Sequence, residues 1–270
     1  MSSLRPKISL IISTYNWPEA LELVFKSVLQ QSVYPLEVII ADDGSGVETR
    51  MVIEDFKAQI SIPVKHIWHE DKGFRLAKIR NKAIAIAEGE YIIQIDGDMI
   101  LHPHFIKDHL TFSKKNSFTR ASRIYIEKEK STEMLNHKLS KINVFNKGIT
   151  NTFSALRIPF LWRFFEKNYK NKGDELYEIH GCNMAFWRED AIKVNGYNEL
   201  FNGWGPEDKE FVARLINLGV EKHFIKLGAL AFHIHHKENE KTYLAENEKA
   251  FKETIDLHKT FCEIGINQYL

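Results

Sequence analysis

The stretch EYIIQIDGDMI, residues 90–100, decides the fold of this chain. Its apolar part, residues 91–95, is typical of a strand that is buried in a parallel sheet. Asp96 and Asp98 follow at once, and two carboxylates separated by one residue on an extended backbone project to the same side. Gly97 between them allows a ligand to approach the main chain closely.

The Asp-Gly-Asp sequence predicts a metal site that also binds a diphosphate. Carboxylate oxygens are ligands that Mg²⁺ and Mn²⁺ prefer, and these ions commonly bridge to phosphates. In an open parallel sheet, ligands bind beyond the carboxyl ends of the strands, which is where Asp96 and Asp98 are expected. The alternative is an acidic turn without a ligand, because Asp-Gly is also a turn signal.

Strands and helices alternate through the rest of the first 112 residues. Apolar runs predict strands over residues 8–13, 38–41 and 64–68, and helical periodicity predicts helices over 18–30, 48–57 and 76–88. Alternation at this spacing is typical of an α/β fold with a doubly wound, mainly parallel sheet.

Residues 113–178 differ in composition from the residues before them. They contain 14 Lys and Arg against 7 Asp and Glu, and an aromatic cluster at 156–170. One interpretation is a helical, basic insertion that packs on the domain. The other is a basic, aromatic surface that contacts an anionic membrane or an anionic acceptor.

The remaining residues return to a regular pattern. We expect a strand that enters a helix over 180–190, a helix over 208–218, a strand over 229–233 and a C-terminal helix over 238–263. The chain is therefore predicted to be one domain, residues 1–270, with four parts. These are a first α/β half (1–112), which carries the predicted diphosphate site, the basic insertion (113–178), a second half (179–240) and the C-terminal helix (241–270).

Composition narrows the class of protein. A chain of 270 residues can bury a sizeable core. Its formal net charge of +1 provides no global field that would attract nucleic acid, so we expect no nucleic-acid partner. Two cysteines give neither a disulfide framework nor a metal-type pair, which predicts a reducing, cytoplasmic setting. No signal-peptide pattern and no apolar run near 18 residues are seen, so no membrane span is expected.

Seven sequence motifs in order carry a resemblance to a known family. They are SLIISTYNWPEAL, VIIADDGS, GFRLAKIRNKAI, GEYIIQIDGDM, GCNMAFWRED, GYNELFNGWGPEDKEFVARL and AFHIHHKENE. Together they resemble the family 2 glycosyltransferases of GT-A fold over roughly residues 7–240. The likeness is to the bacterial chondroitin-polymerase type, whose C-terminal half is similar to the β-1,4-galactosyltransferases.

The resemblance implies an inverting, metal-dependent glycosyltransferase. Such an enzyme moves one sugar, galactose, N-acetylgalactosamine, N-acetylglucosamine or a related one, from a UDP-sugar to a glycan or glycolipid acceptor. The resemblance also implies that the enzyme takes part in the synthesis of capsule, lipopolysaccharide or another surface polysaccharide. A cytoplasmic location is expected, and one alternative within it is peripheral contact with the inner face of the membrane.

Residues after the first two strands are candidates for binding the nucleotide. Tyr15 could stack on a base, and Thr14 or Asn16 could form hydrogen bonds with it, although Asn16 could instead cap the following helix. The resemblance implies that Asp42 or Asp43 accepts the uracil N3–H. The alternative for this pair is a turn. Gly44 and Gly46 lack the third glycine of a dinucleotide-binding motif.

Cations and histidines complete the predicted donor site. Arg75 and Arg80, near a helix start, could meet the diphosphate or the second aspartate of the Asp-Gly-Asp sequence, Asp98. The resemblance places the metal on Asp98 and His233, and it places Asp96 on the ribose or on a metal-bound water. Asp96, His235 and His236 remain further candidate ligands.

The arrangement of the histidines depends on the path of the chain. His235 shares a face with His233 if the strand continues, whereas His236 joins them only if the chain turns. An imidazole ligand favours Mn²⁺ over Mg²⁺. A zinc site with His180 and Cys182 lacks a second cysteine pair.

The segment GWGPEDKE, residues 203–210, is the predicted catalytic loop. The resemblance implies that Asp208 is the general base and that Glu207 forms a hydrogen bond with the acceptor or the donor sugar. The alternative is that these acids only stabilise the start of a helix. Trp204, with Gly205 beside it, could lie against the apolar face of a sugar. Asn183 and Met184 are expected to line the donor-sugar pocket.

Two other functions are alternatives to sugar transfer. A non-catalytic module that binds nucleotide sugars or glycans would need no general base, so Asp208 argues against it. A glycoside hydrolase would need paired carboxylates but no metal site for a diphosphate.

Overall fold

The predicted alternation is present in the computed structural model, which describes residues 5–145, 147–169, 176–237 and 242–270. The first half contains β1 (Ile8–Thr14), α1 (Pro18–Leu29), β2 (Glu37–Asp42), α2 (Val47–Gln59), β3 (Val64–Trp68), α3 (Leu76–Ile86), β4 (Tyr91–Asp96), β5 (Met99–Leu101) and α4 (Phe105–Phe112). All three predicted strands and all three predicted helices before residue 90 are found. Helix α3 ends two residues earlier than expected.

The second half adds strands to the same framework. It contains β6 (Ser117–Ala121), β7 (Arg123–Tyr125), α5 (Lys128–Asn136), η1 (Pro159–Leu161), α6 (Trp162–Tyr169), β8 (Asn183–Trp187), α7 (Arg188–Lys193), α8 (Glu207–Asn217), β9 (Glu221–Ile225), β10 (Ala231–His233), α9 (Leu244–Asp256) and η3 (Ile266–Gln268). The main sheet has seven strands in the order β3-β2-β1-β4-β8-β6-β9. Only β8 runs antiparallel to its neighbours, so the sheet is mainly parallel, as predicted.

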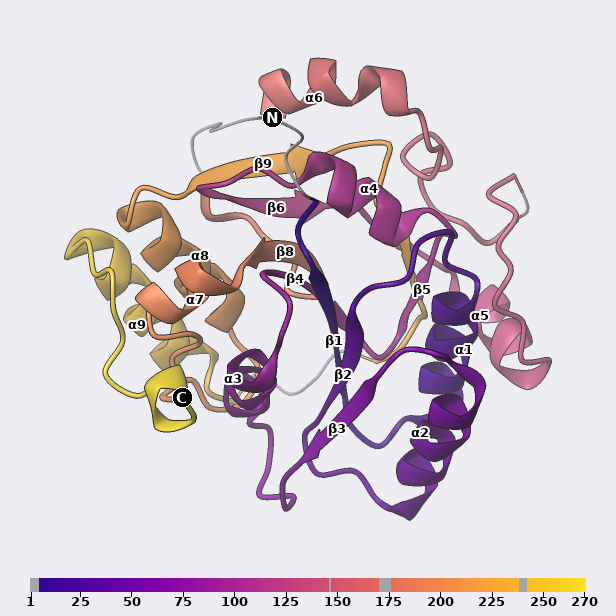
Figure 1. Cartoon of the computed structure of the whole chain (residues 1–270), viewed down its shortest axis with the longest axis horizontal. Coiled ribbons are helices and arrows are strands. Elements are labelled where there is room, and N and C mark those ends of the chain that lie inside the picture. The colour runs from indigo at the N-terminus through magenta and orange to yellow at the C-terminus, as the bar shows by residue number, and fades with distance from the viewer. Residues whose placement is uncertain (1–4, 146, 170–175, 238–241) are drawn as a thin grey trace.

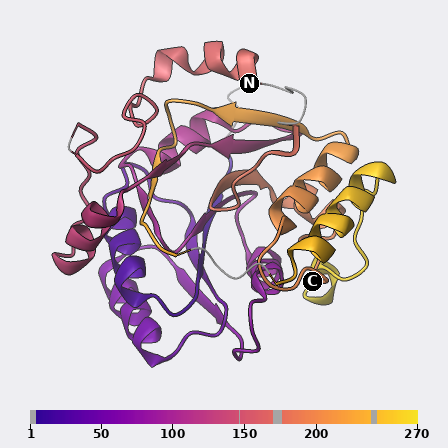
Figure 2. The ribbon, with the colours of Figure 1, turned by 180° about the vertical axis from the view of Figure 1, so that it is seen from behind.

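Helices cover both faces of this sheet (Figures 1 and 2). Side chains of a strand point alternately to the two faces. Leu10 and Ile12 of β1 therefore pack with α1 and α2 in one apolar core, whereas Ile11 packs with α3, α7 and α8 in the other. The strand is buried on both faces, which explains its nearly continuous apolar sequence.

A second, three-stranded sheet lies next to the end of β4. Its order is β5-β10-β7. Strand β5 directly follows the Asp-Gly-Asp sequence, and β10 pairs with it so that His233 faces Met99. The N–H of Ile234 also donates to the carbonyl oxygen of Asp98, at 3.0 Å. This pairing fixes the histidine-containing segment beside the aspartates.

The basic stretch 113–178 is less helical than the sequence predicts. Strand β6 lies inside the main sheet, between β8 and β9, and β7 belongs to the small sheet. Phe118 and Ala121 of β6 are buried in opposite cores, so the segment is held by the sheet despite its high charge. Apart from a short 3-10 stretch at 176–177, the helices among the described residues of this stretch are α5, η1 and α6. In Figure 1, α6 lies on the outer side of the molecule near β9.

The C-terminal helix is also shorter than predicted. Helix α9 ends at Asp256, and His258 soon after it has a positive φ of 48°, which breaks helical geometry. Residues 238–241 of the predicted helix lie outside the described residues. None of the helices in the described ranges is long and apolar enough to cross a membrane.

A buried histidine on α4 makes folding stability sensitive to acid. His109 is fully buried, and its Nε2 lies 3.3 Å from Oδ1 of Asn183. Its Nδ1 is buried and has no hydrogen-bond partner among the described residues. Burial lowers the pKa of His109 to about 4. The unfolded chain, with a histidine pKa of about 6.5, therefore binds more protons than the folded chain between these two values.

We predict that unfolding becomes easier as the pH falls below about 6.5. The contribution of His109 to stability is fully present above that pH, and about 2 kcal/mol of it is lost at about pH 5. His109→Gln keeps an N–H that can donate to Asn183 but cannot be protonated. Urea unfolding at about pH 7.5 and 5 should show a shallower pH dependence in this variant. An unchanged pH dependence would contradict the assignment.

Candidate active site

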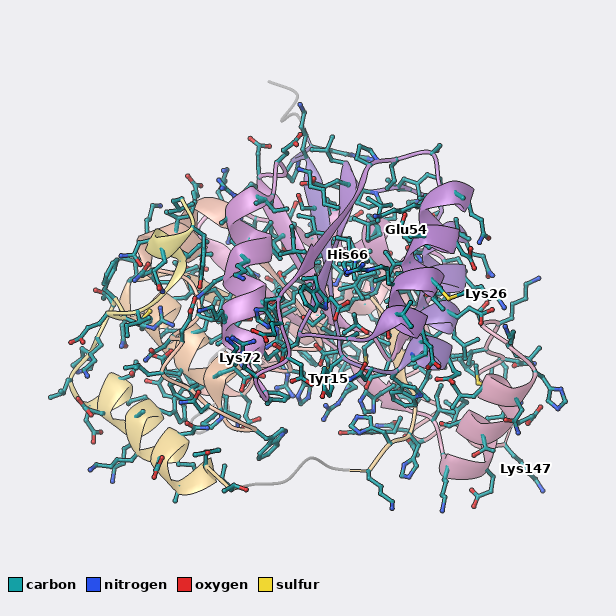
Figure 3. The ribbon with its side chains drawn as sticks, turned by 90° about the horizontal axis from the view of Figure 1, so that it is seen from below. Tyr15, Lys26, Glu54, His66, Lys72 and Lys147 are labelled. Atoms are coloured by element: carbon teal, nitrogen blue, oxygen red, sulfur yellow. The ribbon has the colours of Figure 1, made fainter. Side chains whose placement is uncertain are left out.

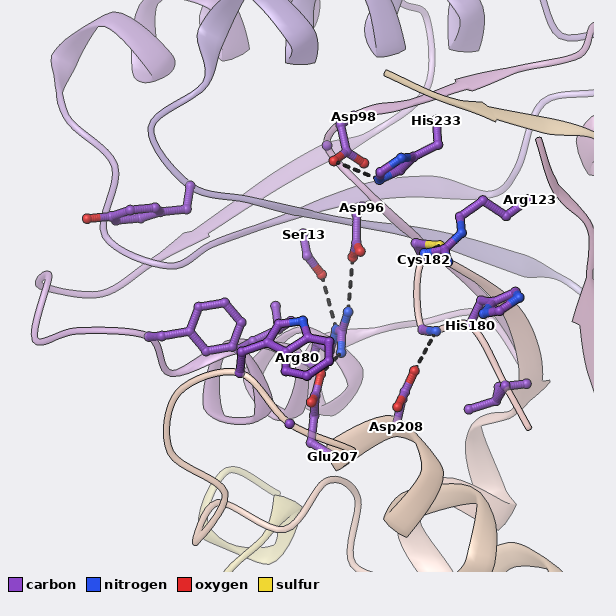
Figure 4. Close-up of a pocket in the computed structure, with 18 of the residues that line it drawn as sticks. Ser13, Arg80, Asp96, Asp98, Arg123, His180, Cys182, Glu207, Asp208 and His233 are labelled. Atoms are coloured by element: carbon purple, nitrogen blue, oxygen red, sulfur yellow. Dashed lines mark hydrogen bonds and ion pairs between the residues drawn. The ribbon is translucent and has the colours of Figure 1, made fainter. Parts of the chain in front are cut away.

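A cavity of about 810 Å³ opens beyond the carboxyl ends of β1 and β4. This is the position at which an open parallel sheet binds ligands. It is lined by groups from both halves of the chain, among them Ser13, Tyr15, Asp43, Arg80, Asp96, Asp98, Arg123, His180, Cys182, Trp204, Glu207, Asp208, His233 and His236. Figure 4 shows Asp98 and His233, the predicted metal ligands, on one side of the cavity, and Glu207 and Asp208 on the opposite side. The side of Asp98 and His233 is called the metal side below.

Gly97 lets the Asp-Gly-Asp turn lie directly against β1. Its N–H donates to the carbonyl oxygen of Ser13 at 2.7 Å. A Cβ at this position would come within 3.0 Å of that oxygen and within 3.1 Å of the Thr14 hydroxyl. A side chain at residue 97 would push the turn away from β1, so the glycine sets where Asp96 and Asp98 lie.

Asp98, His233 and His236 form a group with the donor atoms of a metal site. One ligand atom from each lies within 4.8 Å of the others. Nε2 of His233 and Nε2 of His236 lie 3.3 and 3.2 Å from Oδ2 of Asp98. The other carboxylate oxygen, Oδ1, is buried and has no hydrogen-bond partner among the described residues. One carboxylate and two imidazoles fit a divalent transition metal such as Mn²⁺.

The electrostatics of this group favour an ionised carboxylate. Burial alone would raise the pKa of Asp98, but the two histidines hold that pKa well below its usual range. Asp98 in turn raises the pKa of His236 to about 9, against the opposing effect of burial. The Asp98 carboxylate and the protonated imidazole of His236 attract each other. A bound cation would take the place of the proton on His236.

The structure selects His236 rather than His235 as the second histidine. Strand β10 ends at His233, and the chain then turns. The ring of His236 consequently comes to 5.0 Å from that of His233. His235 lines the cavity but does not belong to the group of three. Neither His180 nor Cys182 belongs to that group, so the described residues offer no support for the zinc alternative.

Arg80 connects the two sides of the cavity. Its guanidinium donates from Nη2 to Asp96, at 3.0 Å, and from Nη1 to Glu207, at 3.1 Å. Nε lies 3.4 Å from the hydroxyl of Ser13. The side chain is 1% exposed, so both ion pairs are shielded from solvent on the Arg80 side. Arg80 therefore holds Asp96, the first aspartate of the Asp-Gly-Asp sequence, whereas it was predicted to meet the diphosphate or the second aspartate, Asp98.

Asp208 is held by main-chain donors at the start of α8. The N–H of Gly181 donates to Oδ2 and the N–H of Lys209 donates to Oδ1, each at 2.8 Å. A Cβ on Gly181 would lie 3.2 Å from Oδ2, so this close approach depends on the glycine. Each carboxylate oxygen can still accept a second hydrogen bond. Asp208 is thus oriented and keeps the capacity to accept a proton from a hydroxyl.

Glu207 has a different environment from Asp208. Burial and the neighbouring Asp208 raise the pKa of Glu207 to about 8, and Arg80 offsets only part of this. Burial also raises the pKa of Asp208, although the two main-chain N–H groups oppose it. Two adjacent buried acids do not both ionise easily. Because Glu207 is bound to Arg80, Asp208 is the acid whose oxygens remain available.

Helix α9 fixes the loop that carries Trp204. Asn247 of α9 donates from Nδ2 to the carbonyl oxygen of Asn202 at 2.9 Å. A Cβ on Gly205 would lie only 2.4 Å from the same Nδ2 atom, so Gly205 allows the helix to approach the loop. Trp204 remains 41% exposed and lines the cavity. Asn247 was not predicted, because nothing in its sequence neighbourhood links it to residues 40 positions earlier.

The predicted nucleotide end is only partly assembled in the cavity. Thr14, Tyr15 and Asp43 line it, and Tyr15 is seen near the middle of the molecule in the view from below (Figure 3). Asn16 does not line it, because its Oδ1 accepts the N–H of Gly46. Asp42 is buried, with its carboxylate bound to His66 and to the N–H of Ser45. Of the two adjacent aspartates, Asp43 is the one that faces the cavity.

Three other predicted contacts are corrected by the structure. Asn183 and Met184 are fully buried and do not line the cavity. The amide of Asn183 donates to the carbonyl oxygens of Ser122 and Ala229, and Met184 packs in the core between the sheet and α8. Arg75 donates to the carbonyl oxygen of Glu70 and borders a separate cavity of about 220 Å³. Strand β8 is buried along its whole length, so its side chains fill the interior on both faces of the sheet rather than the cavity.

Arg123 and Tyr125 line the cavity but were not predicted. They alternate on β7, which pairs in parallel with β10, so that Tyr125 lies next to His233. The rings of Tyr125 and His233 are 5.5 Å apart, edge to face. The signal was the alternation Arg-Ile-Tyr, which is a strand pattern. This strand pattern was missed because residues 113–178 were interpreted as a helical insertion.

Comparison with known proteins identifies the family. The family model described as Glycosyl transferase family 2 matches residues 9–194, which is more than half of the chain. The chain belongs to glycosyltransferase family 2. A second model, described as N-terminal domain of galactosyltransferase, matches residues 163–237 and so covers Glu207, Asp208, His233 and His236. The predicted resemblance is confirmed by both models.

Curated relatives of this glycosyltransferase include polysaccharide synthases. Chondroitin synthase of Escherichia coli is 29% identical over 241 residues, which cover 84% of this chain and 34% of the relative. Hyaluronan synthase of Pasteurella multocida is 26% identical over 240 residues, which cover 84% of this chain and 24% of the relative. The chain thus spans about a quarter to a third of the length of these two relatives.

Solved structures confirm the GT-A fold. S. aureus TarS 1–349 in complex with UDP-GlcNAc has a TM-score of 0.66 at 15% identity, over 97% of this chain and 69% of that one. Mannosyltransferase PcManGT from Pyrobaculum calidifontis, in complex with GDP-Man and Mn²⁺, has a TM-score of 0.61 at 16% identity, over 87% of this chain and 59% of that one. At these identities the likeness concerns the fold alone.

The metal group leads to a prediction that separates the two neighbouring histidines. Mn²⁺ should strengthen UDP binding measured by calorimetry, and Asp98→Ala should abolish that gain. His236→Ala should weaken it at least about tenfold, because a ligand is lost. His235→Ala is the matched control and should leave it unchanged. Equal UDP affinity in chelator, or equal effects of the two histidine variants, would contradict the assignment.

Proposed function

We propose that this family 2 glycosyltransferase moves one sugar from a UDP-sugar to a hydroxyl of a glycan or glycolipid acceptor, with inversion at the anomeric carbon. The observation that carries the proposal is the arrangement of one cavity with two chemically different sides. Asp98, His233 and His236 stand on one side, and Asp208 stands on the other with its carboxylate oriented by main-chain N–H groups. A module that only binds a nucleotide sugar or a glycan would not need an oriented carboxylate such as Asp208.

The first side suits the donor. Tyr15 and Asp43 would hold the uracil, and Asp98, His233 and His236 would hold Mn²⁺ or Mg²⁺. A divalent ion there would neutralise charge on the departing UDP. Asp96 is fixed by Arg80 and would contact the ribose or a water on the metal. The complexes of TarS with UDP-GlcNAc and of PcManGT with Mn²⁺, which share this fold, support a nucleotide-sugar donor and a metal.

The second side suits the acceptor. Inverting transfer needs a base that removes the proton of the attacking hydroxyl on the side opposite the leaving group. Asp96 and Asp98 lie on the leaving-group side, and Glu207 is bound to Arg80. Asp208 is the remaining acid at the start of α8, and it would accept this proton. Trp204 would lie against the acceptor sugar, because its ring is partly exposed and borders the cavity.

Replacement of Asp208 tests the proposed reaction. With the donor that gives the most UDP release among UDP-Gal, UDP-GalNAc, UDP-GlcNAc, UDP-Glc and UDP-GlcA, Asp208→Asn should slow transfer about 10²–10⁴-fold. Asparagine keeps the shape and one carbonyl-type acceptor but loses the basicity. The affinity for UDP and Mn²⁺ should stay the same.

Glu207→Gln is the matched variant for this measurement. Its amide oxygen can still accept from Arg80, so it should lose less activity than Asp208→Asn. Near-normal transfer by Asp208→Asn, or a loss of transfer that follows only from lost UDP binding, would overturn the assignment and favour Glu207. No UDP release from any of the five donors would remove the proposed function itself.

The outer surface of the basic segment offers a second contact. We propose that it lies against an anionic membrane face of the cytoplasm, where a glycolipid acceptor would be presented. Phe160 and Phe164 are 83% and 63% exposed, and the exposed Arg163 lies between them. Exposed aromatic and basic side chains on one short segment are typical of interfacial binding.

Liposome flotation measures this membrane contact. Vesicles that contain anionic lipid should carry the protein at low salt, and high salt should weaken binding by about 1 kcal/mol for each basic residue near the surface. Phe160→Ser together with Phe164→Ser should reduce flotation, whereas Phe153→Ser, on a different part of the segment, should have a smaller effect. No binding to anionic vesicles would leave this surface with only an acceptor role.

A further inference from the structure

Arg123 is a cation in the cavity that the proposed reaction does not use. It lies on β7 and is neither fully buried nor exposed. Its guanidinium carbon lies 4.7 Å from the centre of the Tyr125 ring, and one of its amino groups contacts the Tyr125 hydroxyl. Tyr125 packs against His233 in turn. The Tyr125 ring therefore packs against both the guanidinium and the imidazole of His233.

The charge of Arg123 is not matched by an acid of the described chain. Within the described residues, the guanidinium of Arg123 makes polar contacts with the Tyr125 hydroxyl and with the sulfur of Cys182, which lies 3.8 Å from Nη1. Nε is buried and has no hydrogen-bond partner among the described residues. Burial raises the pKa of Cys182 above its usual range, so the thiol is neutral and a weak acceptor. Arg123 therefore keeps N–H donors that no anion of the described residues occupies, and an anion from outside can accept from them.

Acidic residues outnumber basic ones around the cavity, yet each of the nearest acids already has a partner. Asp96 and Glu207 are bound to Arg80, and Asp98 is bound to the two histidines. Glu178 is paired with Lys209 at 2.5 Å. None of these acids forms a salt bridge with Arg123 within the described residues. Burial and the nearby Arg120, Arg123 and Lys209 lower the pKa of His180 to about 3.

The position of Arg123 relates it to the acceptor side rather than to the nucleotide. In the sheet, β1 and β2 lie on one side of β4, and β8 lies on the other. Cys182, which Arg123 contacts, immediately precedes β8 and follows Gly181, whose N–H holds Asp208. Figure 4 shows Arg123, Cys182 and His180 together on one side of the cavity, away from Ser13 and Arg80. Tyr15 and Asp43, the predicted uracil contacts, follow β1 and β2.

We infer that Arg123 forms a subsite for an anionic group of the acceptor, a carboxylate or a phosphate, bound beside Asp208. This inference rests on the proposed transfer reaction, because it assigns the acceptor to the Asp208 side. An arginine fork can bind either oxyanion through two parallel hydrogen bonds. The amino N–H groups of Arg123 that do not contact Tyr125 or Cys182 provide those donors.

Calorimetry on the protein saturated with UDP and Mn²⁺ tests the subsite. Sodium glucuronate, glucose 6-phosphate and glucose are titrated separately, each with a blank titration into UDP and Mn²⁺ without protein. At least one of the two anions should bind ten or more times more tightly than glucose. Glucuronate alone would identify a carboxylate as the source of the charge, and glucose 6-phosphate alone would identify a phosphate.

Variants of Arg123 decide whether that residue is responsible. Arg123→Gln should remove the preference for the anion while UDP–Mn²⁺ affinity stays the same, and Arg123→Lys should retain part of the preference. Lys107→Gln, which removes an exposed cation of α4 away from the cavity, is the matched control and should keep all of it.

Three results would overturn the inference. They are binding of glucose as tight as that of both anions, no binding of either anion, and an unchanged preference in Arg123→Gln. A loss of UDP–Mn²⁺ affinity in Arg123→Gln would also overturn it, because Arg123 would then serve the diphosphate. Failure of the unaltered protein to bind UDP and Mn²⁺ would instead count against the proposed function, and the anion titrations on the protein alone would then judge the subsite separately.

Discussion

The buried guanidinium of Arg80 is the interaction on which the two sides of the active site depend. It is 1% exposed and pairs with Asp96 at the end of β4 and with Glu207 at the start of α8. These elements are more than 100 residues apart in the sequence. Removing one member of a buried ion pair typically costs about 3–5 kcal/mol, because the partner is left charged and unpaired. Arg80 therefore sets the spacing between the metal side and the proposed base.

The main chain supports this arrangement at points where no side chain would fit. Gly97 lets the Asp-Gly-Asp turn contact β1, Gly181 lets β8 begin against Asp208, and Gly205 lets α9 contact the Trp204 loop. Each of these glycines lies within van der Waals reach of a residue of the proposed mechanism or of a residue that supports it. The site is thus shaped by close main-chain packing as much as by the charged groups that line it.

Much of the fold and part of the site could be predicted from the sequence. Apolar strands that end in acidic residues gave the parallel sheet and the cluster of Asp96 and Asp98, because both follow from local pattern. The role of His236 could not be predicted, because it depends on a turn after β10 that the sequence pattern does not specify. Asn183 and Met184 were misplaced because β8 is buried on both faces, so that neither of these two consecutive side chains reaches the cavity. Strands β6 and β7 were missed because their neighbours in the sheets come from distant parts of the chain.

The central claim is that one cavity holds the metal and UDP on the Asp98 side and leaves Asp208 free on the other. Anomalous diffraction from a crystal of the protein with Mn²⁺ and UDP measures this most directly. The account predicts a manganese peak bounded by Asp98, His233 and His236, a uracil beside Tyr15 and Asp43, and an Asp208 carboxylate that contacts neither. A manganese peak between Glu207 and Asp208 would contradict it, because the proposed base would then be a metal ligand.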